Sequence, residues 1–440
     1  MNNLNRFHTQ FWMVKSAIFA AFFLIFEIKT TAQPGAPAPA QSQSILITGA
    51  TAHLGNGKII QNAAIGFENG KLTLVADATL IRLDLSKYGR RIDVTGKHVW
   101  PGLIALNSRL GLAEVEAARA TVDNQETGTL NPNARAIVAY NTDSEVPPTV
   151  RSNGVLLAQI CPSGGQISGQ SSVVQLDAWN WEDAAIRMDE GVHLNWPRQR
   201  NFNFDGGNPE MRKNDEFDKQ TQALNQLFAE AKAWNSKSDF VEKNQRFDAM
   251  RGLFDGSKTL YLHAENAKNI EESVLFAEKW GCRPVIVGGG ESWLVADFLK
   301  AHTVPVILAR THAVPVHDDS DIDQNFKTPA LLAKAGVEFA ISNEGSWQVR
   351  NLPFQSGQAV GFGLDQEAAL TAITLTPAKI LGIADRVGSL ETGKDATLII
   401  TSGDLLDMRT SKVEQAFIAG REINLDNRQK RLFQKFSSKN

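Results

Sequence analysis

The sequence is poor in cysteine and has no excess of either charge. Its 440 residues include only Cys161 and Cys282, too few for a disulfide framework or a four-thiolate zinc site, and we expect both to be buried and separate. Lys and Arg number 45 against 48 Asp and Glu, which gives a net charge of −3. Nucleic-acid-binding proteins normally carry a basic excess. The balance therefore argues against a nucleic-acid partner.

Several catalytic signatures are also missing. The sequence contains no Gly-x-Ser-x-Gly elbow, no His-x-His pair and no His-Glu-x-x-His helix motif. Residues 288–290 are three glycines, but they lack the Lys and Ser or Thr of a phosphate-binding loop. We therefore expect neither an activated serine nor a ready-made zinc motif.

The first 32 residues read as an export signal. Arg6 and Lys15 precede an apolar run, residues 16–26, which is followed by small residues ending at Ala32. This order is typical of a secretory signal peptide, and the run is shorter than the roughly 20 residues that a membrane span needs. We expect removal of residues 1–32, a secreted or periplasmic protein, and no membrane span afterwards. A Pro- and Ala-rich linker, residues 33–43, follows.

The pattern of predicted secondary structure changes twice along the rest of the chain. Short β runs with turn dipeptides fill residues 44–100, and β texture returns in residues 388–425. Between them, residues 101–387 alternate apolar strand-length runs with helical stretches, and residues 208–251 form a polar helical insertion. Such alternation is typical of a parallel barrel. The sequence predicts an α/β fold, a distorted (β/α)₈ TIM barrel plus a composite β-sandwich built from both chain ends, and a polar tail at 426–440.

Short segments at the junctions make the prediction more specific. They are VWPGLI at 99–104, AALTAITLTPAKILG at 368–382, GSLETGKDA at 388–396, GGQISGQ at 164–170 and LHA at 262–264. In this order they resemble the amidohydrolase superfamily, in particular its imidazolonepropionase-like branch. The resemblance implies metal-assisted hydrolysis of non-peptide carbon–nitrogen bonds, cyclic amides included, at the carboxyl end of the barrel strands.

Most of the metal ligands that this resemblance implies are missing. The two strand-one positions hold Asn107 and Arg109, strand six ends in Gly288, and Asn343 replaces the acid after the last strand. Ala105 also stands where the family often has an acid. Arginine has no lone pair to donate to a cation, so only His263, at the end of strand five, remains a strong ligand. A catalytic zinc site uses three protein ligands. The sequence thus indicates a degenerate metal site.

Other polar residues are candidates for the same mouth. Arg109, Glu114, His263, Glu344 and Arg350 are candidate substrate-binding residues. Alternatively, Arg109 forms an internal salt bridge that fills the emptied site. Two further alternatives are weaker: His193 as an isolated ligand, and a displaced metal in an acidic loop. The loop contains His312, His317, Asp318, Asp319, Asp321 and Asp323.

Two functions stay open on the sequence alone. The first is an exported hydrolase of carbon–nitrogen bonds with a minimal or displaced site for one divalent zinc ion. The second is a pseudoenzyme with no metal cofactor that binds a small molecule or supports an active paralogue, or that assembles with copies of itself.

Overall fold

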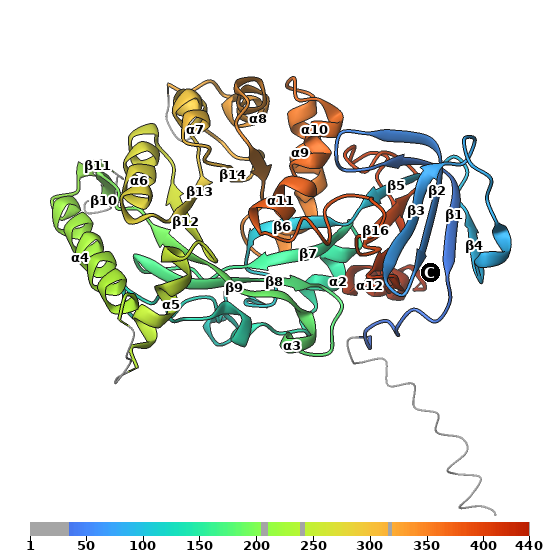
Figure 1. The fold of residues 1–440 in the computed structure, drawn as a ribbon, viewed down its shortest axis with the longest axis horizontal. Helices are drawn as coiled ribbons and strands as arrows, with labels where there is room; N and C mark the ends of the chain where they lie inside the picture. The colour runs from blue at the N-terminus through green and yellow to red at the C-terminus, as the bar shows by residue number, and fades with distance from the viewer. Residues whose placement is uncertain (1–34, 204–209, 238–242, 316–318, 440) are drawn as a thin grey trace, which may run out of the picture. The chain divides into compact units, whose positions relative to one another are not determined.

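The computed structural model describes residues 35–203, 210–237, 243–315 and 319–439 (Figure 1). The expected signal peptide, residues 1–32, lies outside the described residues. Among the described helices, none is long and apolar enough to cross a bilayer.

One sheet is assembled from both ends of the chain, as the sequence predicts. Its strands are β1 (Ile45–His53), β2 (Ile59–Glu68), β3 (Lys71–Asp77), β4 (Arg90–Asp93), β5 (His98–Pro101), β16 (Leu398–Thr401), β17 (Val413–Ile418) and β18 (Arg421–Glu422). Their order is β18-β17-β16-β5-β1-β2-β3, with β4 paired to β1. The join is antiparallel pairing of β16 with β5, where Leu398 lies opposite Pro101. Phe67 and Phe417 pack edge to face across this domain with ring centroids 5.2 Å apart.

The second sheet forms the expected barrel. Its strands, in spatial order, are β15 (Phe339–Ile341), β14 (Val306–Leu308), β13 (Arg283–Gly288), β12 (Thr259–Ala264), β9 (Ala185–Asn195), β8 (Ile167–Gln175), β7 (Val155–Ile160) and β6 (Leu103–Ser108). A bridge between Ser108 and Gly345 brings the two edge strands together, and the Arg109 amide donates to the Gly345 carbonyl at 2.9 Å. The eight strands therefore nearly close on themselves.

One barrel strand runs against the others. β8 pairs antiparallel with both β7 and β9, whereas the sequence predicts only strand–helix alternation (Figure 1). The six residues between Ile160 and Ile167 explain the difference. A parallel return needs a crossover of about a dozen residues or more, so this short connection allows only a hairpin.

Helices cover the other strand connections. They are α2 (Val146–Arg151), α3 (Trp181–Ala184), α4 (Phe217–Asn235), α5 (Gln245–Phe254), α6 (Ala267–Trp280), α7 (Ala296–Ala301), α8 (Gln324–Ala335), α9 (Leu352–Val360), α10 (Gln366–Thr371), α11 (Leu375–Ile380) and α12 (Arg428–Ser437). The insertion predicted at 208–251 contains β11 (Glu210–Lys213), which pairs antiparallel with β10 (Arg200–Asn203) just before it, then α4 and most of α5. The predicted polar tail is instead largely helical, because it forms α12.

The barrel interior is apolar at one end and polar at the other. Tyr261 and Ile307 belong to an interior cluster that also contains Ala378 and Leu381 from the α11 region. The α11 region therefore packs against buried side chains of the barrel strands. Cys161 and Cys282 are buried and free, as expected, and burial raises the pKa of the Cys282 thiol to about 12.

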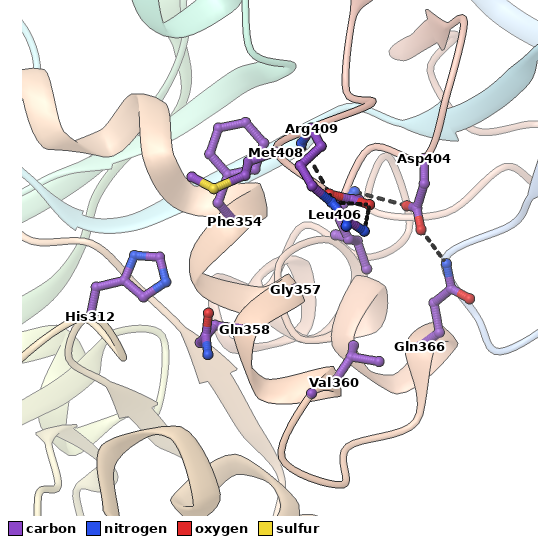
Figure 2. Close-up of a pocket in the computed structure, with 12 residues that line it drawn as sticks. His312, Phe354, Gly357, Gln358, Val360, Gln366, Asp404, Leu406, Met408 and Arg409 are labelled. Carbon is purple, nitrogen blue, oxygen red and sulfur yellow. Dashed lines mark hydrogen bonds and ion pairs between the residues drawn. The ribbon is translucent and has the colours of Figure 1, made fainter. Parts of the chain in front are cut away.

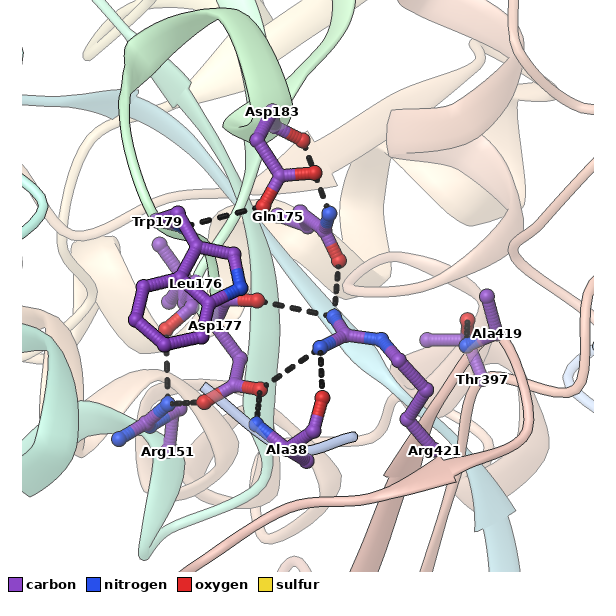
Figure 3. Close-up of polar contacts among 10 residues, drawn as sticks. All are labelled: Ala38, Arg151, Gln175, Leu176, Asp177, Trp179, Asp183, Thr397, Ala419 and Arg421. Atoms are coloured by element: carbon purple, nitrogen blue, oxygen red, sulfur yellow. Dashed lines mark hydrogen bonds and ion pairs between the residues drawn. The ribbon is translucent and has the colours of Figure 1, made fainter. Parts of the chain in front are cut away.

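A buried carboxylate connects the two ends of the described chain to the barrel (Figure 3). Asp177, just after β8, forms ion pairs with Arg151 and with Arg421 of β18, the latter at 3.0 Å. It also accepts a hydrogen bond from the Ala38 amide at 2.9 Å, and the Ala38 carbonyl accepts one from Arg421 at 2.9 Å. Asp177 thus joins Ala38, Arg151 and Arg421 at one buried carboxylate.

Candidate functional site

Polar side chains gather where the barrel strands end at their carboxyl side. Asn107 and Arg109 stand at the end of β6, and His193 and His263 lie on the adjacent parallel strands β9 and β12. Glu344 follows β15, which the Ser108–Gly345 bridge brings back beside β6. Because parallel strands end at one rim, residues from distant parts of the sequence meet here. We call this end the mouth.

A pair of neutral histidines lies at the mouth. The His193 Nδ1 and His263 Nε2 atoms are 2.8 Å apart. Burial and the neighbouring Arg109 charge lower the pKa of His263 to about 4, and burial lowers the pKa of His193 well below its ordinary value. His193 Nε2 is buried with no partner among the described residues. Since buried N–H groups are rarely left unpaired, we infer that Nδ1 carries the proton and donates to His263.

A buried carboxylate is linked to this pair through Tyr261. Glu190 of β9 accepts hydrogen bonds from Gln159 at 2.7 Å, from Ser171 at 2.5 Å and from the Tyr261 hydroxyl at 2.8 Å. Burial raises the pKa of Glu190 despite these three donors. The Tyr261 ring also stacks on His193, with centroids 4.6 Å apart. The hydrogen bonds and stacking fix the His193 ring from below.

A second carboxylate occupies the strand-six position. Glu265, one residue after β12, accepts a hydrogen bond from the Gly290 amide at 3.1 Å. A Cβ atom at Gly288 would displace the Glu265 carboxylate, and the φ of 99° at this position also favours glycine. Desolvation raises the pKa of Glu265. An acidic side chain from the neighbouring strand therefore lies beside Gly288, where the sequence resemblance implies a histidine.

Arg109 pairs with Glu344 across the mouth. Its Nη2 donates to the Glu344 Oε1 at 2.7 Å, and their side chains are 33% and 55% exposed. This is one of the pairings that the sequence suggests for Arg109. A pair this exposed contributes little to stability, about 1 kcal/mol or less. It leaves further guanidinium N–H groups at the rim.

The two asparagines at the other ligand positions are held by the backbone. Asn107 adopts a φ of 50°, in the left-handed region that asparagine tolerates. Its backbone N–H donates to the Gln159 side-chain Oε1 at 3.1 Å. Asn343 donates to the Gln348 carbonyl at 2.6 Å, while its Oδ1 is buried with no partner among the described residues. Neither side chain is joined to the histidine pair.

Glu114 and Arg350, the other candidate binding residues, both contact Trp347, whose indole N–H donates to the Glu114 carbonyl at 3.4 Å. Glu114 accepts a hydrogen bond from Asn141 at 3.3 Å. The Arg350 guanidinium donates to the Trp347 carbonyl at 2.7 Å, and its own carbonyl accepts from Asn153, which precedes β7. Asn153 lies at the amino-terminal end of that strand. The structure thus joins Arg109 with Glu344, but does not join Arg350 to them.

The residues at the mouth do not fit a catalytic divalent metal ion. Among the described residues, no three His, Cys, Asp or Glu side chains are grouped so that they could hold one. The lone pair of His263 Nε2 accepts the proton of His193 Nδ1, so neither of these two nitrogens is free to coordinate. The permanently charged Arg109 acts on the same imidazole. The donor set and the local charge both disfavour a cation here.

The acidic loop does not form a metal site in its described part. Asp321 and Asp323 lie 2.5 and 4.0 Å from the Lys327 ammonium, while His317 and Asp318 lie outside the described residues. His312 instead borders a cavity of about 440 Å³ beside α9 and α10 (Figure 2). Its polar lining is internally paired, since Arg409 bonds Asp407 and Gln366 donates to Asp404 at 2.8 Å. The residues that line this cavity do not include those of the mouth.

The sequence interpretation missed four residues of this end of the barrel, namely Gln159, Glu190, Tyr261 and Glu265. It also left His193 as an isolated residue. A signal was available: in the segment from Glu190 to Asn195, apolar Val192 and Leu194 alternate with Gly191 and His193. Period-two alternation places His193 inside the barrel once the segment is recognised as a strand. Glu265 directly follows the recognised strand that ends near His263.

The histidine pair makes stability sensitive to acid. The folded pKa of His263, about 4, lies below the ordinary value of 6.5, so the unfolded chain binds the proton first as the pH falls. Stability from the neutral ring is complete above about pH 6.5 and is lost towards pH 4, up to about 3 kcal/mol. Urea unfolding at pH 7.5 and 4.5 gives the free energy of unfolding that is lost on acidification, and this loss should be smaller for His263→Gln than for the unmodified chain. His302→Gln, at a surface histidine, should keep the full loss; equal losses in all three proteins would contradict this.

Comparisons with known proteins agree with the fold. The Amidohydrolase family model matches residues 310–423, which run from just after β14 to just after β18 and include neither Arg109 nor His263. An amidohydrolase from Thermotoga maritima MSB8 superposes with a TM-score of 0.73 and 22% identity, over 86% of this chain and 99% of that one. This likeness concerns the fold.

Curated relatives match in part. Amidohydrolase tasK of Hapsidospora irregularis is 20% identical over 365 residues, 73% of this chain and 36% of that protein. An imidazolonepropionase of Mesorhizobium japonicum is 29% identical over 157 residues, 34% of this chain and 37% of the relative. The chain thus spans only about a third of the length of each. The barrel, the composite sheet and the matching carboxyl-terminal segment together support the amidohydrolase superfamily as the family of this chain.

Proposed function

We propose that this chain is a ligand-binding member of the superfamily, which holds a small anionic amide at the mouth and does not perform metal-assisted hydrolysis. The observation that carries the proposal is the position of Arg109 at the rim, 2.7 Å from a single Glu344 oxygen. A guanidinium has five N–H donors in a fixed fork that matches a carboxylate. Glu344 uses part of this fork, and an anionic ligand can use the rest.

The amide part of the ligand is inferred from sequence similarity to relatives. One curated relative is an imidazolonepropionase, and the segments at the barrel junctions resemble that branch. The His193–His263 pair and the Asn343 Oδ1, which has no partner among the described residues, offer polar groups without charge. Such groups suit a cyclic amide bearing one carboxylate. We further propose that the protein acts after export and alongside an active paralogue or another copy of itself.

The test is a binding titration with small cyclic amides that either bear or lack a carboxylate. We expect saturable binding of the carboxylate-bearing compounds, weakened at least about tenfold by Arg109→Gln, since a charge-assisted hydrogen bond contributes about 1.5–3 kcal/mol. Arg350→Gln is the matched control, because that guanidinium bonds a backbone carbonyl and not the mouth residues. Equal binding of neutral amides, or full binding by Arg109→Gln, would refute the proposal.

A working hydrolase is the second candidate. The observation that favours it is that two imidazoles meet near the ends of the adjacent strands β9 and β12. The Glu265 carboxylate lies two residues after His263, beside Gly288 of the next strand, β13. Turnover of cyclic amides by the purified chain, with one divalent ion per chain and loss of activity on chelation, would establish this function. Without added or bound metal we expect no turnover.

A further inference from the structure

The carboxyl-terminal helix α12 has an unusual charge for this protein. Residues 428–439 contain Arg428, Lys430, Arg431, Lys435 and Lys439 and no acidic residue, in a chain whose net charge is −3. In the described chain, Arg431 is the one of these five that forms an ion pair with a carboxylate, at 2.8 Å from Glu145. The helix therefore presents unpaired positive charge to solvent.

The same helix exposes large apolar side chains. Leu432, Phe433 and Phe436 are 39%, 74% and 63% exposed. Spacings of three and four residues bring Phe436 onto the same side as Phe433 and Leu432. The Lys435 ammonium lies 5.9 Å from the centre of the Phe436 ring. An apolar strip flanked by cations therefore runs along the outer side of α12.

Anchoring of α12 to the barrel leaves this strip free. Asn427 caps the helix by accepting from the Lys430 amide at 2.9 Å, and its own amide donates to Ser152 at 3.0 Å. Gln429 accepts a hydrogen bond from Thr149 at 2.8 Å. These contacts and the Arg431–Glu145 pair lie in the first turn of the helix and just before it. Phe433 and Phe436 take no part in them.

We propose that α12 binds the surface of an anionic lipid bilayer and lies in the plane of its headgroups. Helices that do this carry Phe or Leu on one face and Lys or Arg on the other. Lys430 and Lys435 would contact lipid phosphates while the two phenylalanines enter the acyl boundary. With 10 residues α12 is about 15 Å long, half of the roughly 30 Å needed to span the hydrocarbon.

The side chains of α12 fit a lipid surface better than a protein groove. Helices that dock into grooves use apolar anchors at i, i+3 or i+4, and i+7. Leu432 and Phe436 provide two such positions, but the next, residue 439, is a lysine. A short apolar strip with surplus cations instead complements anionic headgroups, each cation contributing about 1 kcal/mol near such a surface. This proposal is independent of the ligand at the mouth.

Sedimentation of the full chain with vesicles tests the proposal. We expect binding to vesicles of phosphatidylglycerol and phosphatidylcholine, and little binding to phosphatidylcholine alone. Phe433→Ser with Phe436→Ser should weaken binding at least about tenfold, and Lys430→Gln with Lys435→Gln about thirtyfold. The matched controls should bind like the unmodified chain. They are Leu80→Ser with Val314→Ser, at side chains 82% and 85% exposed, and Lys58→Gln with Lys334→Gln.

Three outcomes would overturn the proposal: no binding to anionic vesicles, equal binding to both vesicle types, or equal binding by all variants. Self-association that disappears with the phenylalanine pair, without vesicle binding, would instead assign the strip to a second copy of the chain. Thermal unfolding of each variant separates loss of binding from loss of fold. Because both phenylalanines are largely exposed, we expect their melting temperatures to match that of the unmodified chain.

Discussion

Replacing Arg109 with glutamine should raise the affinity of the chain for zinc by about a hundredfold. Two unit charges about 4 Å apart repel by roughly 4 kcal/mol at an effective dielectric near 20, and a divalent ion doubles this. Because each 1.4 kcal/mol is a factor of ten, about a third of the full repulsion already gives a hundredfold change in affinity. Arg109 is one-third exposed, so solvent weakens part of this repulsion. The substitution also frees the Glu344 carboxylate, which Arg109 now holds.

Competition with a zinc-binding dye measures this affinity directly. Arg350→Gln removes an equal charge, one that follows β15 and bonds the Trp347 carbonyl, and it should leave zinc affinity unchanged. Adding His263→Gln to Arg109→Gln should abolish the gain, because zinc would bind by displacing the His193–His263 hydrogen bond, and His263 is the histidine on which the Arg109 charge acts. Tight stoichiometric zinc in the unmodified chain, unaffected by Arg109→Gln, would contradict the electrostatic argument and favour the hydrolase.

Replacing Asp177 with alanine should lower the free energy of unfolding by about 3–5 kcal/mol. Asp177 is 5% exposed and pairs with both Arg151 and Arg421. Removing one partner of a buried ion pair leaves uncompensated buried charge, which is strongly destabilising. The Ala38 amide also loses its acceptor. Figure 3 shows that no other carboxylate among the drawn residues meets Arg151 or Arg421.

Urea unfolding gives the size of this effect. Asp183→Ala is the matched control: Asp183 lies on the same connection, at the more exposed α3, and accepts from the Trp179 amide at 3.0 Å. Asp183→Ala should lower the free energy of unfolding by about 1 kcal/mol or less. Adding Arg421→Met to Asp177→Ala should recover part of the loss, because one buried cation disappears. A cost near that of Asp183→Ala would show that water solvates both arginines.

Much of the fold follows from local pattern. Turn dipeptides and short alternating runs at both ends of the chain predict one composite sheet, and the Leu398–Pro101 pairing confirms it. Strand–helix alternation predicts the barrel. The antiparallel β8 was not predicted, because its residues, Ile167 to Gln175, are almost all buried and lack a clear period. Connection length, not composition, decides its direction.

The site was less predictable than the fold. Arg109 and Glu344 are 235 residues apart, and their meeting follows only from closure of the barrel. The position of Glu265 depends on the empty space at Gly288, and a missing side chain carries no pattern of its own. The helix α12 looked like a polar tail because its residues are mostly charged or amide. Its three exposed apolar side chains become significant only when their shared face is known.

The composite sheet has a consequence for the order of folding. β5 must wait for β16, almost 300 residues later, and at about 5–20 residues per second that wait is roughly 15–60 s of synthesis. During this time β1 to β5 have an unpaired edge at His98 to Pro101, open to pairing with other chains. A premature stop before residue 398 would therefore leave an aggregation-prone sheet. We infer that this chain folds only after residue 398 has been synthesised, with both parts of the sheet forming together.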